Sequence, residues 1–198
     1  MSGFWTDIEA AILAWAQGHS GLPAGHVLWA NQRKANPVRP YATLKRISIR
    51  RIDGPGAEVV CEDDGQGGAV HKVTGRNEFT VSLQVFSSAV VGDGQRTVTS
   101  LAGERTAADY MHELELAISK PSVIDSFSAV NLAAIDVGTI QDLPDDKAGT
   151  WMSRAQMDVI FSCTRTLTDA AFNIEHVQGE VETDDGESIP FAADLQLL

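Results

Sequence analysis

Histidine, cysteine and paired acidic residues are the side chains of this chain that could support catalysis or hold a metal ion. No two histidines have the spacing of metal ligands. The sequence contains no P-loop, no HExxH pair, no CxxC pair and no Gly-rich dinucleotide fingerprint. We therefore expect no enzyme, no cofactor and no metal site. The histidines are His19, His26, His71, His112 and His176.

An enzyme remains an alternative interpretation. A small hydrolase could use His71 or His112 with a nearby carboxylate, although the spacing along the chain does not favour it. A pocket that brought a histidine, a carboxylate and a nucleophile together would support it. The acidic pairs at 63–64, 145–146 and 184–185 lie beside Gly or Pro, which is typical of solvated turns.

The number of cysteines indicates the redox environment of the protein. Cys61 and Cys163 are too few for a disulfide scaffold. A reducing cytoplasm, or a particle assembled there, is therefore expected. The sequence start lacks the basic residues of a secretion signal, and no apolar run approaches the roughly 20 residues of a membrane-spanning helix.

The charge is distributed unevenly. The net charge of the 198 residues is −12, yet residues 1–60 carry seven basic and four acidic residues. Such polarity could order head-to-tail contacts between copies, although a solvated surface without a partner is equally compatible with it. The acidic remainder argues against tight wrapping of nucleic acid, which needs many Lys or Arg contacts to phosphates.

The candidate binding residues are basic and aromatic. Lys45, Arg46, Arg50 and Arg51 lie close together in one predicted strand. They could form a patch for acidic neighbours or phosphates, or they could protect an exposed sheet edge. Trp5 could anchor a subunit interface, since Trp is enriched at interface hot spots.

Three helices are predicted from apolar spacing. In the first helix, Ile8, Ile12 and Trp15 recur on one stripe, and Thr6 or Ser2 could cap its start. The predicted helices span 4–17, 106–119 and 122–132.

The predicted strands flank and follow these helices. The segments 78–87 and 154–164 alternate apolar and polar residues most regularly, so each should have one half-buried face. A bulge is possible at Lys45 and Arg46, where the alternation slips. Turns are expected at 144–146 and 168–169. The predicted strands span 26–30, 41–51, 57–61, 69–73, 78–87, 136–143, 154–164 and 172–181.

This order predicts an α+β fold. The sheet should be mainly antiparallel, with the N-terminal helix and the two central helices packed on one face. One domain is expected over 1–198, with a flexible acidic loop near 62–68 and a C-terminal tail at 182–198. The tail ends in exposed apolar residues that could dock on another protein: Phe191, Leu195, Leu197 and Leu198.

Seven motifs follow one another in a distinctive order along the chain. They are Leu-Pro at 22–23, a strand with Trp-Ala at 27–32, Pro-Tyr-Ala at 39–44, a long strand at 79–86, a helix at 109–121, Trp-x-x-Arg-Ala-Gln at 151–158 and a closing strand at 174–177. Each motif is weak alone, but their order resembles that of the neck terminator (tail completion) proteins of tailed bacteriophages. The resemblance spans roughly residues 4–181.

The resemblance implies a structural virion protein without catalysis. Members form rings, usually hexameric, at the head-proximal end of the tail. The ring stops tail-tube growth and joins the tail to the head connector, and DNA passes through its lumen without sequence-specific binding. The implied partners are other copies, the head connector or adaptor, and the tail tube and sheath, in a virion assembled in the host cytoplasm.

Other structural roles remain open. A head–tail joining protein or a tail tube subunit could have a similar fold. A tube subunit would polymerise into long cylinders, whereas a terminator would stop at one or two rings.

Overall fold

A computed structural model describes most of the chain. The residues fall into two compact units, which we call the helical unit (Met1–Gly56 and Gly75–Arg165) and the hairpin unit (Ala57–Thr74 and Thr166–Leu198). The single domain expected over 1–198 stays a prediction. The described residues are 3–31, 37–53, 58–63, 69–91, 98–99, 105–143, 145–147, 150–170, 176–182 and 188–194.

The three predicted helices are confirmed as α1 (Phe4–His19), α2 (Ala107–Ala117) and α3 (Pro121–Ser128). In α2, Thr106 and Asp109 form a reciprocal capping box that satisfies two free backbone N–H groups. The caps expected for α1 are wrong, because its N-cap is Gly3 and no side chain bonds to the cap.

The strands of the described residues extend and correct the predicted set. The strand β4 is longer than expected, because it joins two predicted segments into one. In chain order the strands are β1 (Val27–Trp29), β2 (Tyr41–Arg51), β3 (Glu58–Asp63), β4 (Ala69–Val91), β5 (Val98–Thr99), β6 (Leu132–Val137), β7 (Gln141–Asp142), β8 (Asp145–Lys147), β9 (Thr150–Ala170), β10 (His176–Glu182) and β11 (Ser188–Asp194).

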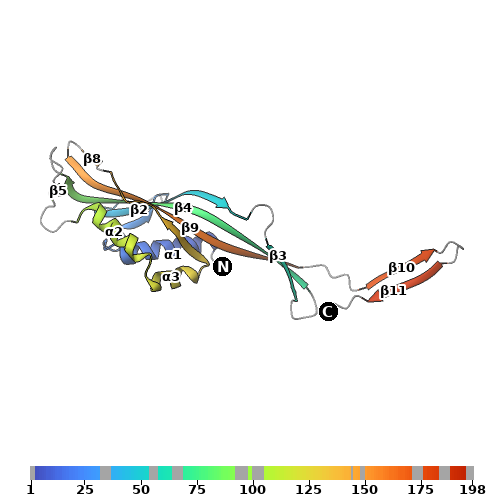
Figure 1. Cartoon of the computed structure of the whole chain (residues 1–198). Helices are drawn as coiled ribbons and strands as arrows, with labels where there is room; N and C mark the ends of the chain where they lie inside the picture. Colours follow the sequence, from blue (N-terminus) through green and yellow to red (C-terminus); the bar gives the residue numbers. More distant parts are fainter. Residues whose placement is uncertain are drawn as a thin grey trace. The chain divides into compact units, whose positions relative to one another are not determined.

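The main sheet has the strand order β1-β2-β4-β9-β6. The pair β1 and β2 is parallel, whereas β2 with β4 and β6 with β9 are antiparallel. The short strands β5, β7 and β8 pair with the long strands β4 or β9. The helices lie on one face of this sheet (Figure 1). The predicted α+β fold, with its mainly antiparallel sheet, is therefore confirmed.

The core lies between this face and the helices. Alternate residues of β4 and β9 point into it, as the period of two requires. At its centre Phe161 stacks on Phe79, with 5.5 Å between ring centroids, and meets Phe127 of α3 edge-on at 5.8 Å. Trp15 of α1 joins the same cluster, with its ring centroid 6.4 Å from that of Phe161. Helix and sheet are thus held together chiefly by burial of large apolar surface.

The described part of the hairpin unit contains two antiparallel strand pairs and the last residues of β9. The strand β3 pairs with the first residues of β4, from Glu58 opposite Thr74 to Asp63 opposite Ala69, which confirms the strands predicted at 57–61 and 69–73. The strand β10 pairs with β11, from His176 opposite Asp194 to Glu182 opposite Ser188. Residues 188–194 of the expected tail are thus a strand.

Four boundary predictions are wrong. The helix α3 ends at Ser128, because Leu132 begins β6 instead of closing a helix. The strand expected at 136–143 is replaced by β6 and the two-residue β7. Residues 145–146, expected in a turn, pair with β9 as part of β8. No turn occurs at 168–169, since β9 continues to Ala170. The start of the expected strand 172–181 lies outside the described residues.

Candidate interaction surface

Trp5 and Arg46 contact each other within one subunit. The Arg46 guanidinium lies 4.7 Å from the centroid of the Trp5 ring, and its Nη1 lies 3.1 Å from Glu9 Oε1, without the alignment of a hydrogen bond. Trp5 also meets Phe79 edge-on, with ring centroids 5.4 Å apart. This cluster fastens the first turns of α1 to β2, so both residues have a role inside the fold.

The four basic residues of β2 do not form one patch. Residues directly opposite in an antiparallel pair share a face of the sheet. Arg46 lies opposite Val81 and Arg51 opposite Asn77, so both are on the face that carries the helices. Lys45 lies opposite Ser82 and Arg50 opposite Glu78, which places them on the other face. A bulge between Arg46 and Ser48, one residue beyond the predicted position, contributes to this division.

Arg50 already has a partner in its own subunit. Its Nη2 lies 2.6 Å from Glu78 Oε2, while three-quarters of the Arg50 side chain stays exposed. Lys45 and Arg51 are exposed as well. The basic side chains available to a neighbouring molecule therefore lie on both faces of one strand.

The sheet face opposite the helices carries a polar network that the sequence analysis did not single out. We call this surface the far face and define it by Gln84, Phe86, Arg154 and Gln156. Arg154 Nη2 donates to Gln84 Oε1 over 2.9 Å, and Gln84 Nε2 donates to Gln156 Oε1 over 3.2 Å. The Arg154 guanidinium also lies 5.2 Å from the centroid of Phe86.

Aromatic stacking extends the far face toward the start of β2. The Phe86 ring stacks on Tyr41 at 4.8 Å, and the Arg39 guanidinium lies 5.6 Å from the Phe86 centroid. Arg39 Nη1 also donates to the Ser87 carbonyl over 3.3 Å. The sequence did contain a signal for this surface. Gln84 and Phe86 occupy the polar positions of their strand, and these residue types are suited to specific contacts with neighbouring side chains.

A groove of about 420 Å³ lies between α3 and β6. The groove was also missed, because its walls come from the end of α2, from α3 and from an edge strand that the pattern did not predict. Ile124 and Ile135 line it and are more than half exposed, whereas Phe127 and Leu132 beneath them are buried. Its lining contains no histidine, so it does not assemble the group that a hydrolase would need.

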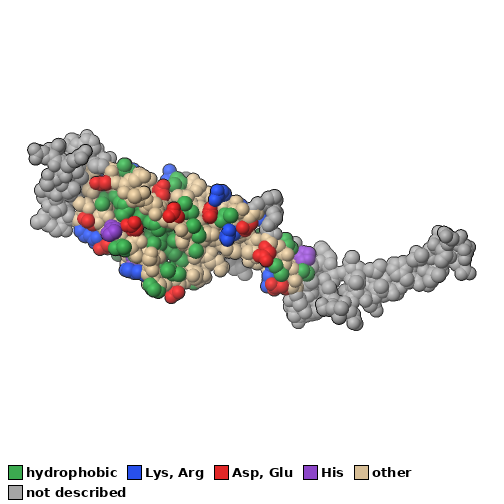
Figure 2. Space-filling model, in the orientation of Figure 1, with side chains coloured by type: hydrophobic (Ala, Val, Ile, Leu, Met, Phe, Trp, Pro, Cys, Tyr) green, Lys and Arg blue, Asp and Glu red, His purple; other side chains and the backbone are tan. Residues whose placement is uncertain are grey.

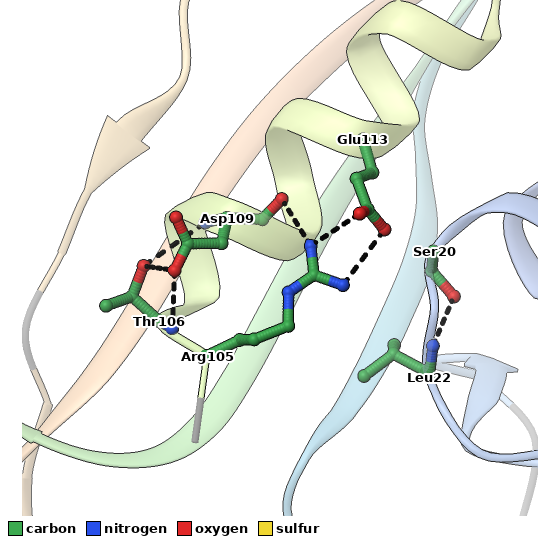
Figure 3. A network of polar contacts seen from close by, with 6 residues as sticks. All are labelled: Ser20, Leu22, Arg105, Thr106, Asp109 and Glu113. Atoms are coloured by element: carbon green, nitrogen blue, oxygen red, sulfur yellow. Dashed lines mark hydrogen bonds and ion pairs between the residues drawn. The ribbon is translucent and has the colours of Figure 1, made fainter. Parts of the chain in front are cut away.

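The start of α2 is tied down by Arg105 (Figure 3). Arg105 Nη2 lies 2.8 Å from Glu113 Oε1 and donates to the Asp109 carbonyl over 3.2 Å. Its guanidinium also lies 4.5 Å from the Tyr110 centroid. In the capping box, Asp109 accepts from the Thr106 hydroxyl and the Thr106 N–H, which lowers the pKa of the Asp109 carboxyl. This network fixes the orientation of α2.

The remaining reactive side chains lie apart. His112 Nδ1 is 2.8 Å from Glu115 Oε2 on the exposed side of α2. His71 lies opposite Cys61 in the hairpin of β3 and β4. Burial raises the pKa of the Cys163 thiol to about 11, so this thiol is a poor nucleophile. Over the described part of the chain, no three His, Cys, Asp or Glu side chains are grouped to hold a metal ion.

The apolar residues expected at the end of the chain are only partly placed. Phe191 lies in β11 opposite Gly179. Leu195, Leu197 and Leu198 lie outside the described residues. Their docking role stays a prediction.

Comparison with known families identifies the chain. A family model described as phage neck terminator protein matches residues 6–187, which is most of the sequence. The chain belongs to the phage neck terminator protein family. The resemblance drawn from the motif order is therefore confirmed. A search of curated proteins found no match.

Membership gives this neck terminator a structural role in the bacteriophage neck, in association with other head or tail proteins of the virion. The family is structural and not an enzyme family. Among the helices of the described ranges, none is long and apolar enough to cross a membrane.

Proposed function

We propose that copies of this neck terminator close into a ring, usually hexameric in proteins it resembles, at the head-proximal end of the tail. The ring terminates tube growth and joins the tail to the head connector. DNA passes through its lumen, and the protein acts without catalysis or a cofactor. Assembly takes place in the host cytoplasm before the ring is incorporated into the virion.

The family match over residues 6–187 is the observation that carries this proposal. The fold is compatible with it, because a ring requires a heterologous interface in which one surface meets a different surface of the next copy. The main sheet has unlike edges, β1 on one side and β6 on the other. A subunit of this kind can add further copies in one direction until the ring closes.

Contacts between copies are proposed for the basic residues of β2. Lys45, Arg50 and Arg51 are exposed and can meet acidic groups of a neighbour. Trp5 and Arg46 already contact each other, so their contribution is to hold β2 and α1 in place at this surface. Phe191, Leu195, Leu197 and Leu198 are proposed to dock on an adjacent ring or tube protein.

An acidic lumen is proposed because of the charge balance. Outside residues 1–60 the chain is strongly acidic, and an acidic wall would repel the phosphates of the passing DNA. A map of the assembled ring with a strongly basic bore would overturn this assignment.

The oligomeric state of the purified protein tests the proposal most directly. We expect closed rings by negative-stain imaging and a discrete mass by sedimentation. Long cylinders would indicate a tube subunit instead, and a monomer with substrate turnover would contradict the structural role.

Phage particles made without this protein give the functional test. The expected phenotype is full heads beside unattached, overlong tails. Tails of normal length still joined to heads would show that this protein neither terminates nor connects them.

Substitution of Arg50 and Arg51 by Glu tests the proposed contacts of β2. This charge reversal should weaken ring assembly as measured by light scattering. Unchanged light scattering would show that these two residues are not part of the interface.

A further inference from the structure

The groove between α3 and β6 is an apolar surface at one edge of the main sheet. Ile124 of α3 is 51% exposed and Ile135 of β6 is 57% exposed. Both line the groove, whose volume of about 420 Å³ is large enough for an aliphatic side chain and its neighbours. Figure 2 shows hydrophobic side chains gathered over the region where Figure 1 places α3.

Side-chain docking suits this edge better than the addition of a strand. In the described residues, β6 pairs with β9 alone, so its outer edge has no strand beside it. A bulge between Ala134 and Asp136 interrupts its register, and bulges and charges on an edge strand oppose regular pairing with another chain. The groove beside the strand is therefore the surface that a partner can fill.

The two edges of the sheet carry opposite charge. Residues 121–143, which contain α3, β6 and β7, include Asp125, Asp136 and Asp142 and no Lys, Arg or His. The described residues within 10–52, which contain β1 and β2, include five Lys or Arg and no acidic residue. Because β1 and β6 end the strand order, the basic segment and the acidic segment lie at opposite edges. Complementary potentials of this kind direct one surface toward the other.

The basic edge also presents an apolar side chain. Val38 is 83% exposed and directly precedes Arg39 and Pro40 at the start of β2. The segment that follows it is anchored by two contacts, because Arg39 donates to the Ser87 carbonyl and His26 Nδ1 lies 2.7 Å from the Pro40 carbonyl oxygen. An anchored segment loses less conformational freedom on binding than a free one, which favours association.

We propose that Val38 of one copy inserts into the α3–β6 groove of the next copy and that this contact joins the subunits of the ring. The basic edge that carries Val38 then faces Asp136, which lines the groove, and Asp125, which follows the groove residue Ile124 in α3. The inference rests on the proposed ring, and it names the two surfaces that build its heterologous interface. Since the two surfaces lie at opposite edges, each copy can donate a valine and accept one at the same time.

Substitutions at either surface test the contact. Val38→Asp and Ile135→Asp should each weaken association at least tenfold, because a charge is placed in an apolar contact. Val38→Lys should weaken it less than Val38→Asp, since only Asp adds repulsion from Asp125 and Asp136. Matched controls are Val59→Asp and Leu167→Asp, at exposed apolar positions of the hairpin unit (60% and 53% exposed). Circular dichroism and thermal unfolding verify that each variant folds.

A mixture of the Val38→Asp and Ile135→Asp proteins tests whether the valine of one copy enters the groove of another. The Val38→Asp copy keeps its groove, and the Ile135→Asp copy keeps its valine. The mixture should therefore form one-to-one dimers that cannot extend, as measured by mass photometry, while each variant alone stays monomeric.

Two results would overturn the inference and are distinguishable. If the wild-type protein forms rings and folded Val38→Asp and Ile135→Asp proteins form them equally well, the contact is wrong and the proposed ring stands. If the wild-type protein forms no ring, the proposed function and the inference fail together.

Discussion

The guanidinium of Arg46 lies over the indole ring of Trp5, 4.7 Å from its centroid, so a side chain of β2 holds the first turn of α1. Glu9 lies beside the same guanidinium. Two residues that the sequence marked as candidates for contacts between copies are thus joined within one copy. The consequence is that a substitution at either residue changes the stability of the subunit before it changes an interface.

Replacement of Arg46 by Ala should lower the free energy of unfolding by about 1–2 kcal/mol, because it removes the cation–π contact and the neighbouring ion pair. Urea unfolding followed by tryptophan fluorescence or circular dichroism measures it. Arg50→Ala is the control, since its pair with Glu78 is largely exposed and contributes little. Equal losses for the two variants would contradict the role of Arg46 in the fold. In a double-mutant cycle, the loss of unfolding free energy in the Trp5→Ala, Arg46→Ala double variant should differ from the sum of the two single losses.

Replacement of Asp109 by Ala should cost about 1 kcal/mol at neutral pH, because it removes one half of the capping box. The pKa of Asp109 is lowered by its bonds with Thr106, so ionised Asp109 stabilises the folded state above the ordinary pKa of 3.8. That stabilisation is lost as the pH falls through the lowered pKa. The difference in unfolding free energy between wild type and Asp109→Ala should therefore shrink in acid. A difference that does not change with pH would contradict this role of Asp109. The control is Asp125→Ala, at an exposed position of α3.

Substitution of Gly21 by Ala should destabilise the protein by about 1–3 kcal/mol. Gly21 has a φ of +67°, and an added Cβ would lie 3.0 Å from both Arg105 Nη1 and Glu113 Oε2. Gly18 lies inside α1 with open space around it, so Gly18→Ala should instead stabilise by about 0.5–1 kcal/mol. Thermal unfolding of both variants compares them directly. A gain in melting temperature for both would show that Gly21 is not constrained.

The two cysteines should differ in reactivity toward a thiol reagent at pH 8. Cys61 is exposed, whereas burial raises the pKa of the Cys163 thiol to about 11 and keeps it protonated and inaccessible. Mass spectrometry of the native protein after brief alkylation should find modification at Cys61 only, and denatured protein should be modified at both residues. Rapid native labelling of Cys163 would contradict its place in the core.

The sequence predicted the elements whose pattern is local and regular. The alternation around Leu83 and Val159, and the apolar stripe through Ile12 of α1, are strong because one face of each element is buried. The strand β6 was missed because its bulge at 134–136 breaks the alternation. The strands β8 and β11 were missed because acidic and mixed segments become strands only through pairing with β9 and β10.

The candidate surfaces were less predictable than the elements. The position of the bulge in β2 decides which face each basic residue occupies, and an alternation pattern locates a bulge only to within a residue or two. Arg46 was therefore grouped with Lys45 although the two side chains point to opposite faces. The α3–β6 groove depends on the meeting of segments around Ile118 and Ile135, and no spacing within either segment signals it.

The unlike edges of the main sheet give each subunit a direction. With a basic rim at β1 and β2 and an acidic rim at β6, two copies cannot meet rim to matching rim without repulsion, so growth of an assembly would proceed in a single sense. The angle between the two rims is fixed by the strands between them. In the proposed ring, the number of copies would then depend on the twist of one subunit's sheet, with no external template to count them.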